Sequence, residues 1–317
     1  MPTLAPKLPW THAFAGGYPR LGGQLLPSDP DAIDYLARVA AADGAAVEVG
    51  VAMAVDQFVK GCKSDSAGYA GDPTRTVWDA LKASCIMCGA RTLAGALVPL
   101  KGASPTNVAN NFASGDYDRS SGLKGDGATK YLDTNRASNA DGQDDVHQSV
   151  YLSSADTRYA SAVGMTYIGS SSPGSAISAG PYANILYVNN RSGSQAISGA
   201  SASATGLLAS SRSSSSSYSV RAGNANFSKE VASAVPGSGN AFVMADNASG
   251  STLYHTNARL AFYSIGSAIP DLAALDTRVT QLVTGIKFHS LTGLVATDYD
   301  PDTVAYIVAA YESGGTL

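Results

Sequence analysis

The four histidines and the abundant serines are the first candidates for nucleophilic catalysis in this chain. The histidines are His12, His147, His255 and His289. A catalytic serine needs a base and an orienting acid within hydrogen-bond reach, and no serine here lies in a GxSxG turn. We therefore predict no Ser-His-Asp site, and we expect His147 and His255 to lie in loops or at strand ends.

Paired carboxylates are the next candidates, because cleavage of a glycosidic bond needs two acids that face one groove at a fixed separation. The glutamates are Glu48, Glu230 and Glu312, and the first and last fall in expected helices. No expected strand carries acids at the alternating spacing that places them on one face. We therefore assign no catalytic residue and predict that the chain is not an enzyme.

Two further patterns resemble metal or redox motifs. Cys85 and Cys88 have CxxC spacing, but a zinc site would need two more ligands, and only the distant Cys62 is available. A redox pair would need a thioredoxin-like βαβ context, which is missing. We predict that Cys85 packs in the core of a helix and that Cys88 lies at the end of that helix. The alternating acids Asp298, Asp300 and Asp302 lack the central glycine and terminal glutamate of a calcium loop, so they are predicted to cap a helix.

Carbohydrate binding needs an aromatic platform beside hydrogen-bonding side chains. Residues that could supply these groups are Tyr159, Tyr182, Asn184, Asn189 and Asn190. Tyrosine is also the most frequent aromatic residue, at 16 positions, and many tyrosines must belong to the core or to interfaces. We therefore assign no sugar-binding residue, no cofactor-binding residue and no metal ligand from the sequence.

The composition excludes several classes of protein. Hydrophobic residues make up 44% of the 317 residues, which is enough for a core, whereas charged residues make up only 15%. The net charge of −4 provides no basic patch for nucleic acid. The N-terminal sequence lacks the features of a secretory signal, and no apolar stretch approaches the length of a bilayer span. We expect a soluble protein that is made in a cytoplasm, does not insert into membranes and does not bind nucleic acid.

Helices are expected in the first third of the chain, after an extended, proline-rich arm over residues 1–28. Ser28 or Asp29 can cap a helix that Gly44 ends. A second helix is predicted from Ala45 to Lys60, stopped by Gly61. A third is predicted over residues 76–88, because its apolar residues follow helical spacing.

Short strands are expected from about residue 105 to residue 266, where apolar runs alternate with Ser, Gly and Asn clusters. Many short strands with frequent turns favour an antiparallel sandwich or barrel. Helical spacing returns after Pro270 and again over residues 300–313. The pattern DPDAIDYLARVAAADG at 29–44 is echoed by DPDTVAYIVAAYESGG at 300–315. The two segments are either ordinary capped helices or a duplicated attachment element.

Two segments carry a family resemblance: SGLKGDGATKYLDTNRASNADGQDDVHQSVYLSS at 121–154, and TNARLAFYSIG at 256–266 followed by LAALDTRVTQLVTGI. They resemble the concanavalin A-like, laminin-G-type domains of phage virion structural proteins, such as tail-fibre or decoration proteins. The resemblance implies a jelly-roll β-sandwich and a place in a virus particle. Because such domains sometimes bind calcium through loop acids, it also leaves open a surface calcium ion. The acids clustered in the sequence are Asp126, Asp133, Asp141, Asp144 and Asp145.

Together these observations predict a mainly β protein, an antiparallel concanavalin A-like β-sandwich flanked by N- and C-terminal α-helices. The expected parts are an arm (1–28), a helical attachment region (29–104), the sandwich (105–268) and C-terminal helices (269–317). The predicted function is that of a bacteriophage virion structural protein, a compact fibre or spike, baseplate or capsid-decoration subunit. It would assemble with itself, as a trimer by analogy, and with other virion proteins. The alternative is a lectin-like adhesin for a host-surface glycan. A polysaccharide-cleaving enzyme is the third hypothesis.

Overall fold

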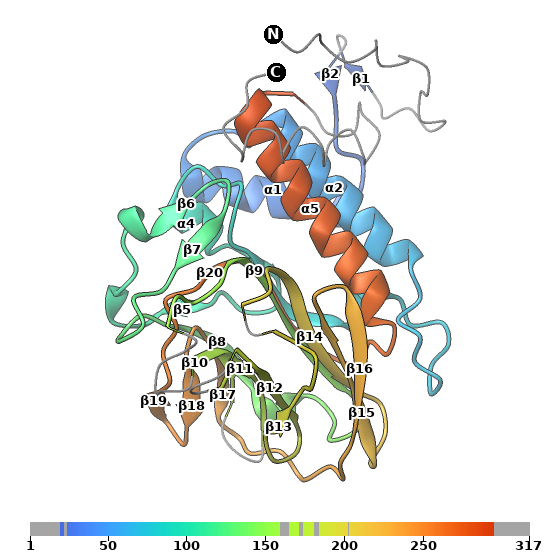
Figure 1. The fold of residues 1–317 in the computed structure, drawn as a ribbon. Coiled ribbons are helices and arrows are strands. Elements are labelled where there is room, and N and C mark those ends of the chain that lie inside the picture. The colour runs from blue at the N-terminus through green and yellow to red at the C-terminus, as the bar shows by residue number, and fades with distance from the viewer. Residues whose placement is uncertain are drawn as a thin grey trace, which may run out of the picture.

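The computed structural model describes residues 20–21, 24–158, 165–170, 174–180, 184–201 and 203–294. Helices cover one face of a large antiparallel sheet, and a second sheet packs on the opposite face (Figure 1). The expected β-sandwich with flanking helices is therefore confirmed. Most of the predicted arm, the predicted helix over 300–313 and its echo of the first helix lie outside the described residues.

The helices on the outer face come from both ends of the described chain. They are α1 (Pro30–Asp43), α2 (Val49–Ser64), the single turns α3 (Val77–Ala80) and α4 (Leu93–Ala96), and α5 (Leu272–Thr292). The predicted ends of α1 are confirmed, because the Asp29 side chain accepts hydrogen bonds from Asp31 N and Ala32 N, and Gly44 adopts φ +66°. The helix expected after Pro270 is confirmed as α5, with Asp271 as its cap.

The predicted bounds of α2 were wrong at both ends. The helix begins at Val49 rather than Ala45, and it continues through Gly61 to Ser64. Gly61 does not stop it, because this glycine makes room for α5. A Cβ atom at Gly61 would lie 2.6 Å from Arg278 Cδ. The glycine therefore permits close helix packing in the interior of α2, where its helix propensity is otherwise unfavourable.

The larger sheet contains nine strands among the described residues. Seven form the order β16 (Ala225–Glu230), β15 (Ser217–Ala222), β14 (Gly206–Arg212), β9 (Val146–Ser154), β20 (Arg259–Gly266), β3 (Leu81–Ile86) and β4 (Pro99–Lys101). A short hairpin of β6 (Tyr117–Asp118) and β7 (Gly122–Lys124) joins it where β7 pairs with β20.

The third predicted helix, over residues 76–88, was wrong. Only α3 is helical there, held by a capping box between Thr76 and Asp79, and the chain then continues as the strand β3 between β20 and β4. The apolar residues Val77, Trp78, Leu81 and Cys85 match helical spacing across the segment. Only residues 81–85 alternate apolar and polar side chains, a run too short to outweigh that pattern, and pairing with β20 and β4 makes it a strand. The division of the chain into an arm, a helical attachment region, a sandwich and C-terminal helices stays a prediction.

The smaller sheet has seven strands in the described part of the chain. Their order is β13 (Gln195–Ala196), β12 (Leu186–Asn190), β11 (Ser175–Ala179), β10 (Met165–Gly169), β17 (Asn240–Val243), β8 (Leu132–Ala137) and β5 (Thr106–Asn107). The remaining strands form two small hairpins, β1 (Arg20–Leu21) with β2 (Gln24–Leu25), and β18 (Asp246–Ala248) with β19 (Ser251–Leu253). The strands β5 to β20 all lie in the region, from about residue 105 to residue 266, for which short strands were predicted.

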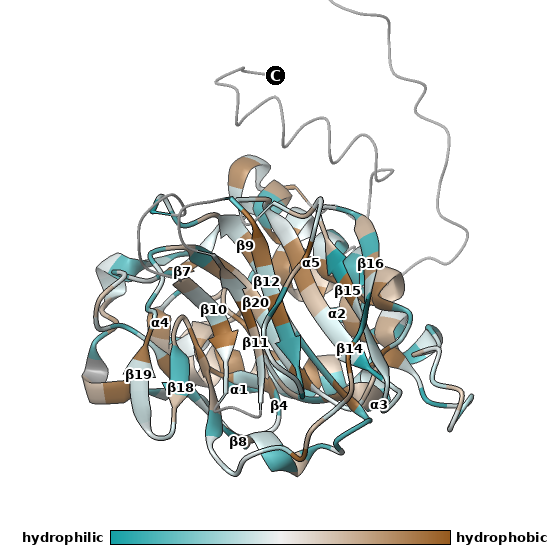
Figure 2. Ribbon diagram, turned by 60° about the horizontal axis from the view of Figure 1, so that its bottom comes forward, coloured by the Kyte–Doolittle hydropathy of each residue, from teal (hydrophilic) through white to brown (hydrophobic). Residues whose placement is uncertain are grey.

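One hydrophobic cluster lies between the helices and the larger sheet, and a second lies between the larger and the smaller sheet. Along β14, Leu207 and Ala209 belong to the cluster beneath the helices, whereas Leu208 belongs to the cluster between the two sheets. This alternation buries both faces of the larger sheet. Hydrophobic residues accordingly follow α2, α5 and the central strands (Figure 2). Within the described ranges, no helix has the length and hydropathy needed to cross a membrane.

Candidate functional site

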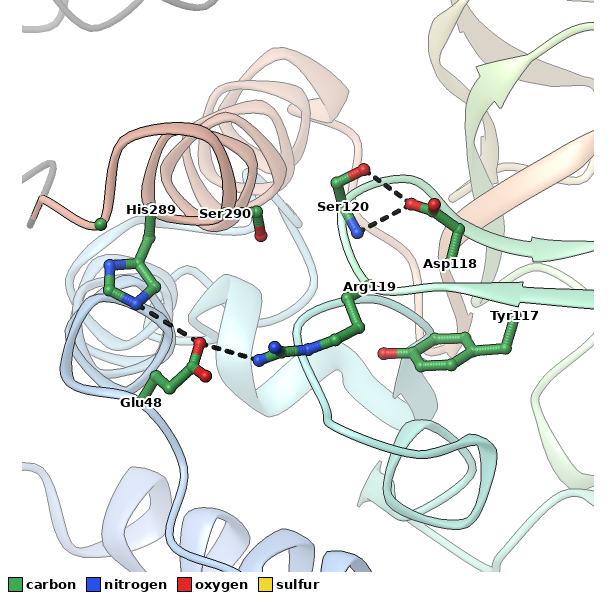
Figure 3. Close-up of a pocket in the computed structure, with 8 residues that line it drawn as sticks. Glu48, Tyr117, Asp118, Arg119, Ser120, His289 and Ser290 are labelled. Atoms are coloured by element: carbon green, nitrogen blue, oxygen red, sulfur yellow. Dashed lines mark hydrogen bonds and ion pairs between the residues drawn. The ribbon is translucent and has the colours of Figure 1, made fainter. Parts of the chain in front are cut away.

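An open pocket of about 660 Å³ lies where three parts of the fold meet (Figure 3). Glu48 comes from the start of α2, His289 from the last turn of α5, and Tyr117 to Ser120 from β6 and the turn that follows it. The pocket is therefore built by segments that are distant in sequence, at the boundary between the helical layer and the sandwich.

The close contact between α2 and α5 depends on Gly50. A Cβ atom at this position would lie 2.2 Å from His289 Nδ1, so only glycine leaves room for the imidazole at the start of α2. His289 Nε2 then lies 3.4 Å from Glu48 Oε2. The packing of the two helices thus sets the width of this side of the pocket.

Glu48 is surrounded by basic groups. Its carboxylate lies 2.8 Å from Arg119 Nη2 and 3.2 Å from Arg91 Nη2, in addition to His289. The hydrogen bond from Arg119 lowers the pKa of Glu48 and outweighs the opposing effect of burial. Glu48 is therefore ionised at neutral pH and connects the helical layer to the β6–β7 turn.

Tyr117 and Arg119 share an anchor on the opposite wall of the pocket. The Tyr117 hydroxyl donates to Ala90 O at 2.7 Å, and Arg119 Nε donates to the same oxygen at 3.0 Å. The backbone is also fixed, because Gly89 N donates to Arg119 O at 2.7 Å. This wall is consequently held in place before any ligand arrives.

Asp118 organises the turn between β6 and β7. Its Oδ1 atom accepts hydrogen bonds from the backbone N and the hydroxyl of both Ser120 and Ser121, at 2.6 to 2.9 Å. Burial would raise the pKa of this carboxyl, but these four bonds outweigh it and bring the pKa to about 2. Asp118 is therefore a fixed, ionised acceptor beside Arg119.

The three histidines that the structure describes lie in different places. His289 lines the pocket. His147 is the second residue of β9 and is fully buried, and His255 lies in the loop after β19. His12 lies outside the described residues. The structure therefore brings none of the described histidines to a serine in an accessible position, since the Ser264 partner of His147 is itself fully buried.

The prediction that Cys85 packs inside a helix was wrong, because Cys85 lies on β3 and Cys88 follows that strand. Both thiols are buried, and so is Cys62. Cys85 Sγ donates to Ala96 O at 3.0 Å. Burial raises the pKa of all three thiols, to about 12 for Cys88. These cysteines are packing residues with little thiolate character.

Four of the five acids considered for calcium are each held by a different partner, and the fifth, Asp144, lies near an arginine. Asp126 caps backbone amides of residues 128–130, and Asp133 contacts Asn240. Asp141 pairs with Arg136, Asp145 pairs with Arg75, and Asp144 lies near Arg212. No three Asp, Glu, His or Cys side chains in the described ranges converge as a metal site. Asp298, Asp300 and Asp302 lie outside those ranges.

The three described candidates for sugar binding do not line this pocket. Asn184 bonds to Ser203, Asn189 donates to Gly174 O, and Asn190 is buried and donates to Ser210 Oγ. Tyr159 and Tyr182 lie outside the described residues. Sequence reasoning missed Tyr117, Arg119 and the role of Glu48. The Asp-x-Ser-Ser run at 118–121 marks a turn, but nothing in the sequence shows that α2 and α5 meet it.

Comparison with known proteins finds no matching family model and no matching curated protein. Among solved structures, a mutant Trypanosoma rangeli sialidase with trans-sialidase activity has 9% identity over 75% of this chain and 38% of that chain, with a TM-score of 0.45. The botulinum neurotoxin serotype D binding domain has 10% identity over 64% and 51%, with a TM-score of 0.43. The NanB sialidase from Streptococcus pneumoniae has 16% identity over 47% and 26%, with a TM-score of 0.35. The chain thus spans a quarter to a half of these proteins. At scores this low, we base no function on the likeness.

Proposed function

We propose that this chain is a non-catalytic, lectin-like module that binds a glycan in the pocket between Glu48, Asp118, Arg119 and His289. The observation that carries the proposal is a matched donor and acceptor on adjacent residues of that pocket. All four hydrogen bonds that described residues donate to Asp118 use Oδ1, which leaves Oδ2 to accept. Arg119 bonds through Nε and Nη2, which leaves Nη1 to donate. A pair of this kind suits two neighbouring hydroxyls of a sugar ring.

The rigidity of the pocket supports the same proposal. Tyr117 and Arg119 are anchored on Ala90 O, and Asp118 is fixed by its turn. A ligand therefore orders few side chains when it binds, and the entropic cost of association is correspondingly small. The aromatic ring of Tyr117, which also lines the pocket, provides an apolar surface beside the polar groups, as sugar binding requires.

The charge state of the pocket favours binding over cleavage. Glycoside hydrolysis needs a carboxylic acid whose raised pKa keeps a proton ready for the leaving group. Here the pKa values of both Glu48 and Asp118 are lowered, that of Asp118 to about 2. Neither residue holds a proton near neutral pH, so the pocket has no general acid among these two carboxyls.

A pair of tryptophan substitutions on α5 tests the proposal. Ser290 is exposed and lines the pocket, so Ser290→Trp fills it with an indole ring. Thr277 is exposed on the same helix outside the pocket and makes the same type of hydrogen bond to the preceding turn, so Thr277→Trp is the matched control. The wild-type protein is screened on an array of bacterial and animal glycans, and hits are measured by calorimetry.

We expect the wild type and Thr277→Trp to bind the same glycan with similar affinity and Ser290→Trp to lose binding. Absence of any hit on the array, or equal binding by Ser290→Trp, would show that this pocket is not a glycan site. Release of reducing sugar from a bound glycan would instead contradict the non-catalytic assignment.

For the biological setting, we propose a virus particle, in which the chain is a compact fibre, spike, baseplate or decoration subunit. The support is the resemblance of residues 121–154 and 256–286 to phage virion domains and the low proportion of charged residues, 15%, which suits surfaces packed against neighbouring subunits. We expect a homo-oligomer, with a trimer favoured by analogy. Light scattering on the purified protein and mass spectrometry of purified particles test this setting. A monomer that is absent from particles would overturn it and leave the glycan experiment unaffected.

A further inference from the structure

A second cavity lies inside the sandwich, well away from the proposed glycan pocket. It has a volume of about 10 Å³, and its lining includes Arg191, Ser175, Ser138 and His147. Arg191 directly follows β12, Ser175 begins β11, and His147 lies on β9 of the other sheet. The cavity therefore lies between the two sheets, and its lining combines polar side chains with the apolar side chains of Val146 and Ile265.

Arg191 is the unusual member of this lining. It is only 2% exposed. Its backbone adopts φ +54°, a conformation that residues other than glycine rarely take. Its Nη atoms donate to Ser138 Oγ and Ser138 O and, at 3.4 Å, to Asp141 O. All of these acceptors are neutral. The Nε atom makes no hydrogen bond to any described residue.

The charges around Arg191 do not balance. Asp141 is an acid that acts on it electrostatically, but both Asp141 carboxylate oxygens accept hydrogen bonds from Arg136, at 2.8 and 2.5 Å. Arg212, also fully buried, adds a further positive charge near Arg191, and its own neighbouring acid is Asp144. The guanidinium groups of Arg136 and Arg191 thus share the single carboxylate of Asp141. Burial of an unpaired charge is strongly unfavourable.

Burial lowers the pKa of Arg191 to about 10, so the side chain still carries its positive charge at neutral pH. His147, on the same cavity, does not contribute charge there, because burial lowers its pKa to about 4. A second atom of this lining, Ser175 Oγ, is also buried and makes no hydrogen bond to any described residue. The cavity therefore has two free hydrogen-bond donors and an excess of positive charge.

We propose that this cavity binds one small monovalent anion of the halide type, held by Arg191 Nε–H and Ser175 Oγ–H. The size of the cavity limits the ligand, because a space of about 10 Å³ accommodates one monatomic ion or one water molecule and excludes the larger sulfate and phosphate. A water molecule would satisfy the two donors but would leave the charge of Arg191 uncompensated. A halide satisfies the donors and the charge together, and it joins β11 and β12 to the opposite sheet.

The test uses the full chain and measures the midpoint of thermal unfolding in sodium bromide and in sodium gluconate at equal ionic strength. Binding to the folded state alone raises the midpoint as ligand concentration rises, and we expect bromide to raise it by about 5 °C relative to gluconate, given the size of the chain. The variants are Ser175→Ala, which removes one donor, and Ser178→Ala as a matched control. Ser178 lies on the same strand and does not line the cavity.

We expect Ser178→Ala to keep the bromide-dependent rise and Ser175→Ala to lose at least half of it. Arg191→Met should abolish the rise, whatever the baseline stability of that variant. Bromide anomalous scattering from crystals should show one peak beside Arg191 and Ser175. An equal midpoint in both salts, or a crystal in which a water molecule replaces the expected peak, would overturn the proposal. Glycan binding by the surface pocket is independent of either result.

Discussion

We expect the stability of this protein to fall between about pH 6.5 and pH 4, because His147 is buried as a neutral imidazole. The side chain is fully buried in β9. Its Nδ1 atom lies 2.6 Å from the backbone oxygen of Ser267, and its Nε2 atom lies 2.9 Å from Ser264 Oγ. Since a carbonyl only accepts, Nδ1 carries the proton, and Nε2 accepts from Ser264. Ser264 Oγ also shares a hydrogen bond with Ser149 Oγ, at 2.7 Å.

The magnitude follows from the difference between the folded and unfolded pKa values. Burial lowers the pKa of His147 from 6.5 to about 4 in the folded state. The unfolded state therefore binds a proton as the pH falls through 6.5, while the folded state does not bind one until about pH 4. Stability is thus fully present above pH 6.5 and is lost progressively down to pH 4. Two to three pKa units correspond to a loss of about 3 kcal/mol.

The assay is urea unfolding from about pH 7.5 to about pH 4.5, a window that lies above most carboxylate titration. His147→Gln removes the main titrating group, so we expect it to be less stable than the wild type at neutral pH but much less sensitive to pH in this window. The remaining dependence comes from His255, whose pKa burial also lowers. His289→Gln, which removes an imidazole outside the sandwich, should keep the full acid-dependent loss. A wild-type stability that is flat across the window, or an unchanged slope in His147→Gln, would refute the reasoning.

Three further predictions follow from the packing of the helices on the sandwich. Gly50→Ala should lower the free energy of unfolding by about 1–3 kcal/mol in urea, because its Cβ atom would overlap His289, and it should also weaken glycan binding. Arg221→Met should cost about 3 kcal/mol, because it leaves the buried Asp276 without its ion-pair partner at 2.7 Å. The double variant with Asp276→Leu should recover much of that loss, and a double-mutant cycle measures the difference. The three thiols should react with Ellman's reagent only when the protein unfolds, since all are buried. Rapid labelling of the folded protein would contradict their burial.

The strand-rich part of the fold was largely predictable, because strands with one polar face show the alternation that identifies them. β15 reads Ser-Tyr-Ser-Val-Arg-Ala, and Tyr218 and Val220 face the core as the pattern indicates. The helix α1 was equally clear, because Asp29, Pro30 and Gly44 are local capping signals. Both kinds of signal act within a few residues, so the sequence alone displays them.

Other features depended on tertiary contacts. β3 was mistaken for a helix because Leu81 and Cys85 continue the helical spacing of Val77 and Trp78, whereas the chain pairs with β20 and β4 from Leu81 onward. Gly61 was mistaken for a helix end because its function is to accommodate Arg278 of α5. In each case the deciding partner is distant in the sequence.

By itself, the sequence determined the class of the protein: a core-forming, weakly charged chain with short alternating strands and capped helices, and without a catalytic motif. Only the tertiary structure decided which polar groups work together. Glu48, Arg119 and His289 converge because α2 and α5 pack at the β6–β7 turn. Arg191 and Ser175 line one cavity because β11 and β12 are neighbours within one sheet. The convergence of polar side chains from distant segments depends on long-range packing, whereas secondary structure is encoded by local patterns.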